Sequence, residues 1–232
     1  MKNEFTILGC GSSLGSPWIT NYSGNLKKSP KNIRTRCCAH IKKDNLSILI
    51  DTSPDIKSQF LKNKINSLDA IIYTHEHADQ TSGIFEMRPF FWKNKKKIPV
   101  YGSFRTIKEL KEKYTFCFSQ RHGYKPIMKA NIINGMFKIK KEDSNINIFP
   151  FDVTHGMIMA TGYLFENIAY ISDCNKISNK ITNKLKNLDY LVIDCLKKNK
   201  HPSHFSFEDA INFSKFIKPK TTILTNLHVD LD

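Results

Sequence analysis

The stretch that decides the fold runs Ala70-Ile71-Ile72-Tyr73-Thr74-His75-Glu76-His77-Ala78-Asp79-Gln80. Its apolar start, residues 70–73, predicts a buried strand that leads directly into His75. Because side chains alternate along an extended chain, we expect His75 and His77 to point to one side and Asp79 to continue the pattern. Imidazole and carboxylate ligands suit zinc, manganese or iron. A single histidine is more often a core or surface residue, but this alternation at a strand end predicts a metal site.

Three further candidate ligands follow segments that resemble strands. They are His155 after Phe151-Asp152-Val153-Thr154, Asp173 after Ile171-Ser172, and His228 after Thr225-Asn226-Leu227. Each is a weak signal when it is taken alone.

Hydrophobic periodicity and turn residues predict more strands than helices. Strands are expected at 5–8, 38–41, 47–50, 70–73, 98–101, 146–151, 163–165, 169–171, 190–194 and 222–225. Helices are expected at 54–63, 83–91, 104–114, 182–188 and 207–217, with Ser53 and Ser206 as caps of the first and last. Residues 12–36 predict a long loop. The strands fall into two halves, which indicates an α/β or α+β class with two sheets.

The length of 232 residues fits one domain over 1–232, and the 40% hydrophobic content is typical of a soluble globular protein. No apolar run approaches the roughly 20 residues of a membrane span. Met1-Lys2-Asn3-Glu4-Phe5 lacks the features of a signal peptide, so we expect a cytoplasmic protein without membrane contact. The six cysteines show no framework spacing and no Cys-x-x-Cys pair, which predicts free thiols.

The formal net charge of +15 leaves two interpretations open. Clustered cations neutralise phosphates, which favours RNA or an anionic substrate as a partner. However, the excess consists of 31 lysines against five arginines, and the lysines are dispersed, as codon bias would produce.

The order Thr-His-x-His-x-Asp, then a distant His, Asp and His, resembles that of the metallo-β-lactamase superfamily. The segments Leu8-Gly9-Cys10-Gly11-Ser12-Ser13 and Leu49-Ile50-Asp51-Thr52-Ser53-Pro54-Asp55 support this resemblance. Within the superfamily, the chain is similar to the phosphodiesterase branch that includes PhnP, and more remotely to ribonuclease Z. The motifs that carry this finer resemblance are Arg34-Thr35-Arg36-Cys37-Cys38, Gly83-Ile84 with Arg88-Pro89, and His201-Pro202-Ser203-His204-Phe205-Ser206.

The resemblance implies an α/β fold, a four-layer αβ/βα sandwich of two mixed β-sheets flanked by helices. It also implies one or two metal ions, Zn²⁺ or alternatively Mn²⁺ or Fe²⁺. The implied ligands are His75, His77 and His155 for one ion, Asp79 and His228 for a second, and Asp173 between them. Asp51 would orient a ligand histidine, although a structural turn cap is an alternative role for it.

The chain departs from the family pattern at Gln80, where the family has a histidine after the aspartate. An amide oxygen is a poor zinc ligand, so we expect a weakened second site, a harder metal, or a water in place of this ligand. Relatives usually continue further past the last histidine, so we expect the sequence to be short at its C-terminus.

These residues predict a metallo-hydrolase that cleaves a small phosphodiester, either linear or cyclic, through a metal-activated hydroxide. Asp79 would orient or deprotonate the water, and His204 would protonate the leaving alkoxide or stabilise the charge that develops on the phosphate. His201 and Arg36 are expected to bind the phosphate, although a plain turn and a surface salt bridge are their alternative roles. The competing functions are a tRNA-processing ribonuclease, a thioester or lactone hydrolase, and a basic RNA-binding protein with a degenerate metal site. A homodimer is an open alternative to a monomer.

Overall fold

The structure is a computed structural model that describes residues 3–24, 26, 27 and 29–231. The expectations for the start at Met1-Lys2 and the end at Asp232 therefore concern residues outside the described part. The described chain divides into two compact units. The first combines the N-terminal strand up to Leu8 with Cys38–Ile146, and the second combines Gly9–Cys37 with the residues from Asn147 onward. The expectation of a single domain stays a prediction.

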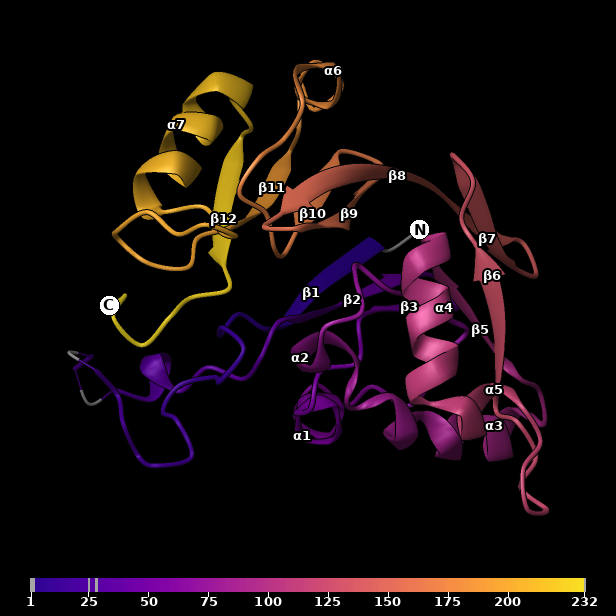
Figure 1. Ribbon diagram of the computed structural model, residues 1–232. Coiled ribbons are helices and arrows are strands. Elements are labelled where there is room, and N and C mark those ends of the chain that lie inside the picture. Colours follow the sequence, from indigo (N-terminus) through magenta and orange to yellow (C-terminus); the bar gives the residue numbers. More distant parts are fainter. Residues whose placement is uncertain (1–2, 25, 28, 232) are drawn as a thin grey trace. The chain divides into compact units, whose positions relative to one another are not determined.

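The first sheet has six strands in the order β1-β2-β3-β4-β5-β6. Strands β3 to β6 run parallel to one another, and β2 is antiparallel to β3. Helix α4 packs on β5 and β6 (Figure 1). The strands are β1 (Asn3–Gly9), β2 (Cys38–Lys43), β3 (Leu46–Ile50), β4 (Ala70–Ile72), β5 (Ile98–Gly102) and β6 (Met128–Ile132). The helices between them are α1 (Ile56–Lys62), α2 (Ala78–Thr81), η2 (Ile84–Met87), α3 (Arg88–Asn94), α4 (Phe104–Lys113) and α5 (Thr115–Phe118).

The second sheet also has six strands, in the order β12-β11-β10-β9-β8-β7. Strands β10, β11 and β12 are parallel, whereas β9 is antiparallel to both of its neighbours. The strands are β7 (Phe137–Lys141), β8 (Ser144–His155), β9 (Ile158–Phe165), β10 (Ile168–Ile171), β11 (Tyr190–Asp194) and β12 (Thr221–Thr225). The helices of the second unit are η1 (Pro30–Asn32), α6 (Asn179–Thr182) and α7 (Phe207–Ile217).

Each unit has its own hydrophobic core. In the first, Leu49 and Ile71 from neighbouring strands pack with Leu110 of α4. In the second, Ile171 and Ile193 pack with Ala210 of α7, which lies against β11. Burial of such side chains stabilises each sheet by removing apolar surface from water. The two mixed sheets with helices confirm the predicted fold class.

Most predicted elements are confirmed, and four predictions are wrong in detail. Ser53 does not cap the first helix, because α1 begins at Ile56 with Asp55 at its N-cap position. The helix expected at 182–188 is instead the short α6, because Ser178 caps the chain earlier by accepting a hydrogen bond from the backbone N–H of Ile181. The helix expected at 83–91 is broken into η2 and α3, with Pro89 at the start of α3. The alternation expected to reach Asp79 ends at His77, since residues 78–81 turn into α2.

Two features at helix starts match the sequence. Ser206 caps α7 as expected, and Asp209 closes a capping box with it.

Among the described residues, no helix combines the length and the hydropathy that crossing a membrane requires.

His40 on β2 leads to a prediction about stability and pH. Its Nε2 lies 2.8 Å from the Ser47 hydroxyl, which donates its own proton to the carbonyl oxygen of Ser67. Burial, with a smaller contribution from Lys42, lowers the pKa of His40 to about 4 from 6.5. Between these pH values the unfolded chain binds a proton that the folded chain does not. We therefore expect His40 to reduce the free energy of unfolding by about 2–3 kcal/mol as pH falls from 7 to 4.5.

Urea unfolding at both pH values measures this effect. His40→Gln keeps a donor for Ser47 but does not titrate, so its stability should depend less on pH than that of the parent. His122→Gln, at an exposed position, is the matched control and should retain the parent's dependence. Equal pH dependence in His40→Gln and the parent would contradict the role of burial.

Candidate metal centre

Parallel strands bring the first candidate ligands to one edge of the first sheet. Asp51 directly follows β3, and His75 comes three residues after β4, which pairs in parallel with β3. The carboxyl ends of these strands therefore meet at the same edge, which is where ligands bind in open α/β sheets. Asp51 adopts a left-handed backbone conformation, with φ of 64°.

A chain of hydrogen bonds runs from Asp51 through Thr74 to His75. The Asp51 carboxylate accepts from the backbone N–H and from the hydroxyl of Thr74, both at 2.8 Å. Because this hydroxyl has only one proton, its oxygen is left to accept from His75 Nδ1 at 3.0 Å. The proton of the neutral His75 ring is thus held at Nδ1, and the lone pair remains at Nε2, the form in which imidazole binds metals.

His77 and Glu76 show the predicted alternation. The rings of His75 and His77 lie with their centroids 4.6 Å apart. Glu76 points the other way and accepts a hydrogen bond from Arg105 Nε at 2.6 Å. Burial raises the pKa of Glu76, but the hydrogen bonds that its carboxylate accepts and the positive charge of Arg105 together outweigh burial, so the net pKa is lowered. The ionised Glu76 therefore ties this loop to α4, and the two histidines share one side.

Asp79 and Gln80 lie on the short helix α2 of the same unit. Gln80 is fully buried, and its amide Nε2 donates to Asp79 Oδ2 at 3.4 Å. The side chain that replaces the family's histidine thus presents its amide nitrogen to the carboxylate. Thr81 helps to hold this turn by donating from its hydroxyl to the carbonyl oxygen of His77.

In the second unit, four strands that run in the same direction deliver polar side chains to one edge of the second sheet. His155 ends β8, Asp173 follows β10, Asp194 ends β11 and Asn226 follows β12. The register pairs Ile171 with Ile193 and Asp194 with Thr225, so these ends are level.

Two of the histidines in this unit are oriented through Nδ1. His155 Nδ1 lies 2.8 Å from the carbonyl oxygen of Ser203, which can only accept, so Nδ1 carries the proton. His204 Nδ1 lies 2.8 Å from the carboxylate of Asp194 and donates to it. Both neutral rings therefore keep the lone pair at Nε2.

Asp194 and Asn226 organise the centre of this cluster. Buried Asp194 also accepts from the backbone N–H of Cys174, and Asn226 Nδ2 donates to Asp194 and to Asp173 at 3.1 and 3.2 Å. Burial raises the pKa of Asp194 to about 6, although the hydrogen bond from His204 opposes this effect. At neutral pH Asp194 is ionised, and the amide of Asn226 separates the two carboxylates.

The second unit therefore contains a group that fits a divalent metal ion. His155, Asp173 and His204 each offer a ligand atom, and these atoms lie within 4.8 Å of one another. Two imidazoles and a carboxylate, with the rings fixed by a carbonyl and a carboxylate, form the donor set of a zinc site with its supporting hydrogen bonds. His204, expected as a proton donor, therefore lies beside two of the predicted ligands, His155 and Asp173.

The remaining predicted residues of the second unit lie in different surroundings. His201 Nδ1 accepts from the backbone N–H and hydroxyl of Ser203, so its proton is at Nε2 and the ring is a donor rather than a ligand. Burial and the neighbouring charge of His204 lower its pKa. His228 packs edge-on against Trp18 and lies 3.0 Å from Asp230.

Arg36 pairs through its backbone with Gly11, in the loop that follows the first strand. Its phosphate-binding role stays a prediction, as does the complete ligand set.

Sequence reasoning missed Asp194, Asn226, Thr74 and Ser203 as supporting residues. Asp194 carried a usable signal, because it ends a strand as Asp173 follows one. Ser203 contributes a backbone carbonyl, which no residue type could indicate.

Comparisons with known proteins agree with this geometry. The family model described as a β-lactamase superfamily domain matches residues 47–226. An octanoyltransferase of Porphyromonas gingivalis (strain ATCC BAA-308 / W83) is 28% identical over 225 residues, which make up 95% of this chain and 45% of the relative. The chain thus spans less than half of that relative's length.

Solved structures show the same fold. A crystal structure of a new diphosphatase from the PhnP family superposes with a TM-score of 0.89 at 28% identity, covering 100% of this chain and 88% of the other. Zn²⁺-bound PqqB from Methylobacterium extorquens has a TM-score of 0.76 at 14% identity, with 99% and 90% covered. The short form of human tRNase Z has a TM-score of 0.71 at 15% identity, with 98% and 93% covered.

The family match covers most of the chain, and the fold and the histidine groups agree with it. This protein belongs to the metallo-β-lactamase superfamily, as its sequence pattern predicted, and its structure resembles that of a member of the PhnP family.

Thr74 provides a test of how His75 is oriented. Thr74→Val keeps the size of the side chain but removes the hydroxyl between Asp51 and His75, so we expect zinc affinity to fall about 10- to 100-fold. Equilibrium dialysis against zinc with elemental analysis measures this change. Thr74→Ser retains the hydroxyl and is the matched control. Parental zinc affinity in the folded valine variant would show that the hydroxyl does not orient His75.

Proposed function

We propose that this protein is a metal-dependent phosphodiesterase that acts on small phosphodiesters, with zinc, manganese or iron as its metal. The observation that carries the proposal is the orientation of three imidazoles. In His75, His155 and His204, a protein acceptor holds the proton at Nδ1. The likeness to a diphosphatase of the PhnP family supports a phosphorus ester as the substrate.

The proposed ligand set follows the family resemblance. It comprises His75, His77 and His155 for one ion, Asp79 and His228 for a second, and Asp173 for both. A bound divalent metal supplies Lewis-acid chemistry, because it polarises phosphoryl oxygens and lowers the pKa of water.

The side chains divide the proton transfers between them. Asp79 orients the attacking water and takes its proton as the new oxygen–phosphorus bond forms. His204, when protonated, gives its Nε2 proton to the alkoxide as the bond from phosphorus to the leaving group breaks. Ionised Asp194 stabilises the imidazolium and holds its ring, as the carboxylate of a catalytic triad does.

Two residues are proposed to hold the substrate. The Nε2–H of His201 donates to a phosphoryl oxygen, because Nδ1 of this ring accepts from the backbone N–H of Ser203 and leaves the proton at Nε2. Arg36 pairs with the phosphate through its guanidinium.

A diphosphate ester is a second candidate substrate, favoured by the likeness to the diphosphatase of the PhnP family. It presents the same phosphorus centre with a phosphate leaving group. We do not propose octanoyl transfer, because the relative with that activity is matched over 45% of its length.

His77 tests the proposed activity. His77→Ala should abolish hydrolysis of bis(p-nitrophenyl) phosphate, since it removes an imidazole ligand, while the fold is kept because the side chain is exposed. Release of p-nitrophenolate and circular dichroism measure the two effects. His122→Ala, at an exposed histidine of the same unit, is the control and should keep the parental rate. Unchanged turnover in the metal-loaded His77→Ala variant would remove His77 from the site.

Gln80 tests the account of the second metal. Gln80→His should raise the affinity for a second zinc, because imidazole is a stronger ligand than a carboxamide. Elemental analysis of protein purified without chelator, at limiting zinc, measures the number of bound ions. Gln80→Asn keeps an amide and is the matched control. Equal metal content in the histidine variant and the parent would contradict this account.

A further inference from the structure

Three exposed aromatic rings lie around one arginine on the surface of the first unit, and a fourth ring packs against one of the three. The guanidinium carbon of Arg88 lies 4.7 Å from the ring centroid of Trp92, 5.2 Å from that of Tyr124 and 5.6 Å from that of Phe85. Phe116 extends the group by packing edge-on against Phe85 at 5.6 Å. We call these five residues the aromatic cluster. The residues of the aromatic cluster come from η2, α3, α5 and the loop before β6. The cluster therefore forms only when the chain folds.

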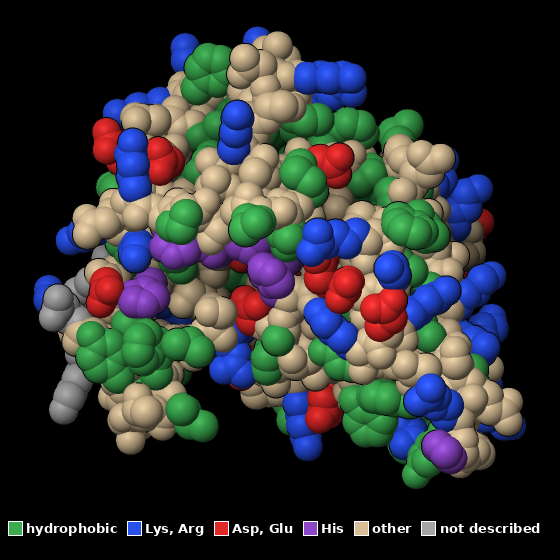
Figure 2. All heavy atoms as spheres, in the orientation of Figure 1, with side chains coloured by type: hydrophobic (Ala, Val, Ile, Leu, Met, Phe, Trp, Pro, Cys, Tyr) green, Lys and Arg blue, Asp and Glu red, His purple; other side chains and the backbone are tan. Residues whose placement is uncertain are grey.

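The cluster is open to solvent and is cationic. Its four rings are between 41% and 57% exposed, which is high for Trp and Phe side chains. Over residues 3–24, 26, 27 and 29–231, no carboxylate forms an ion pair with Arg88. The sequence has no acidic residue between Glu112 and Glu142, but six lysines and one arginine in that interval. Figure 2 shows hydrophobic and basic side chains gathered at the lower right, over the loop that follows α5.

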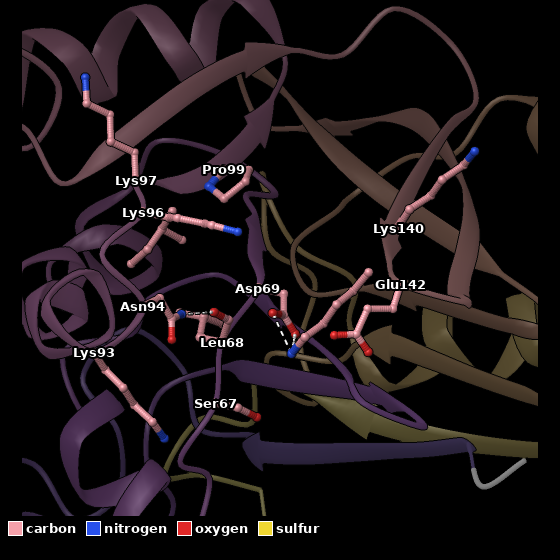
Figure 3. Close-up of a pocket in the computed structure, with 12 residues that line it drawn as sticks. Ser67, Leu68, Asp69, Lys93, Asn94, Lys96, Lys97, Pro99, Lys140 and Glu142 are labelled. Atoms are coloured by element: carbon pink, nitrogen blue, oxygen red, sulfur yellow. Dashed lines mark hydrogen bonds and ion pairs between the residues drawn. The ribbon is translucent and has the colours of Figure 1, made fainter.

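A lysine-rich cavity of about 670 Å³ lies in the same unit. Two of its carboxylates are already engaged: Asp69 pairs with Lys141 at 2.9 Å, and Glu142 accepts from Asn45. Lys96, Lys97 and Lys140 have no carboxylate partner within the described chain. Figure 3 shows Lys96 extending across the cavity, with Lys97 and Lys140 directed away from it. The cavity therefore carries an excess of positive charge.

The aromatic cluster and the cavity lie at one edge of the first sheet. Ile98, which lines the cavity and begins β5, donates its backbone N–H to Ile127, just before β6. Ile127 in turn donates to Cys117 of α5, next to Phe116. This edge contains the amino ends of β5 and β6, whereas Asp51 and His75 follow the carboxyl ends of the parallel strands. The surface is therefore separate from the candidate ligands of this unit.

We propose that the aromatic cluster and the lysine cavity together bind single-stranded nucleic acid. Exposed rings stack on bases of any sequence, arginine stacks on bases as well, and unpaired lysines attract the phosphates. The charge and the exposed rings of this surface favour nucleic acid over a second copy of the chain or an acidic peptide. A second copy of the chain would place one cationic face against another, and an acidic peptide would leave the four rings without stacking partners.

Trp92 and the lysines give two independent tests with the full-length chain. A fluorescein-labelled oligouridylate of about 12 nucleotides is titrated by anisotropy, and Trp92→Ala should weaken binding about fivefold or more. The double variant Lys96→Gln/Lys97→Gln should lower the slope of log affinity against log salt by about one.

In a Trp18→Phe background, Trp92 is the remaining tryptophan, and its fluorescence should be quenched on binding.

Matched controls distinguish binding at this surface from the effects of an exposed ring or of lysine charge elsewhere in the unit. Phe104→Ala, at a ring of α4 that is 67% exposed, and Lys57→Gln/Lys62→Gln on α1 should bind as the parent does. Trp92→Phe should restore most of the affinity lost in Trp92→Ala. Comparison with oligodeoxythymidylate tells whether RNA or DNA is preferred, and tight binding of either supports the proposal.

Three results would overturn the proposal. They are unchanged affinity in Trp92→Ala, binding of heparin as tight as that of the oligonucleotides, and self-association through Trp92 without oligonucleotide binding. Hydrolysis of bis(p-nitrophenyl) phosphate by Trp92→Ala should equal that of the parent, so failure here leaves the proposed enzymatic function intact.

Discussion

Hydrogen bonds to Nδ1 decide which ring nitrogen of a histidine is left to bind a cation, and the chemistry of this protein depends on them. His75 is held by the Thr74 hydroxyl, His155 by the carbonyl of Ser203 and His204 by the Asp194 carboxylate. A neutral imidazole has a single N–H, so fixing it at Nδ1 puts the lone pair at Nε2. His201, whose Nδ1 accepts, is the contrast within the same unit.

Strand direction makes these bonds geometrically possible. Asp51 reaches Thr74 because β3 and β4 are parallel and end level with each other. Asp194 reaches Asn226 because the register of β11 and β12 brings Asp194 opposite Thr225. The candidate ligands follow the carboxyl ends of the strands. The amino ends of the strands in the first sheet are therefore available for the aromatic cluster and the lysine cavity. The two edges of one sheet thus carry different chemistry.

The part of the site that sequence could predict is the part with local signals. The apolar run 70–73 and the spacing of His75 and His77 required only the period of a strand, and both are confirmed. The sequence places Asp194 at the end of a strand, but its partners could not be predicted, because His204 and Asn226 are 10 and 32 residues away along the chain. Such pairs form only when strands are neighbours in the folded sheet.

The same physics explains the errors in the fold. Ile181, Leu185 and Leu188 have the spacing of a helical face, and all three contact the core. The chain reaches them through turns instead, with Asn187 in a left-handed conformation at φ of 61°. Asp79 was expected in extended backbone because hydrophobic pattern gives no sign of a one-turn helix. In the first case the cap at Ser178 starts α6 earlier in the chain, and in the second the chain turns into α2 directly after His77.

The central claim is that Nε2 of His75 and of His155 is the nitrogen that binds metal. Anomalous diffraction at the zinc edge, from crystals grown with zinc, tests it most directly. Zinc density about 2.0–2.1 Å from each of these Nε2 atoms is the predicted result. Zinc bound to either histidine through Nδ1, or no zinc at either ring in zinc-saturated crystals, would contradict the claim.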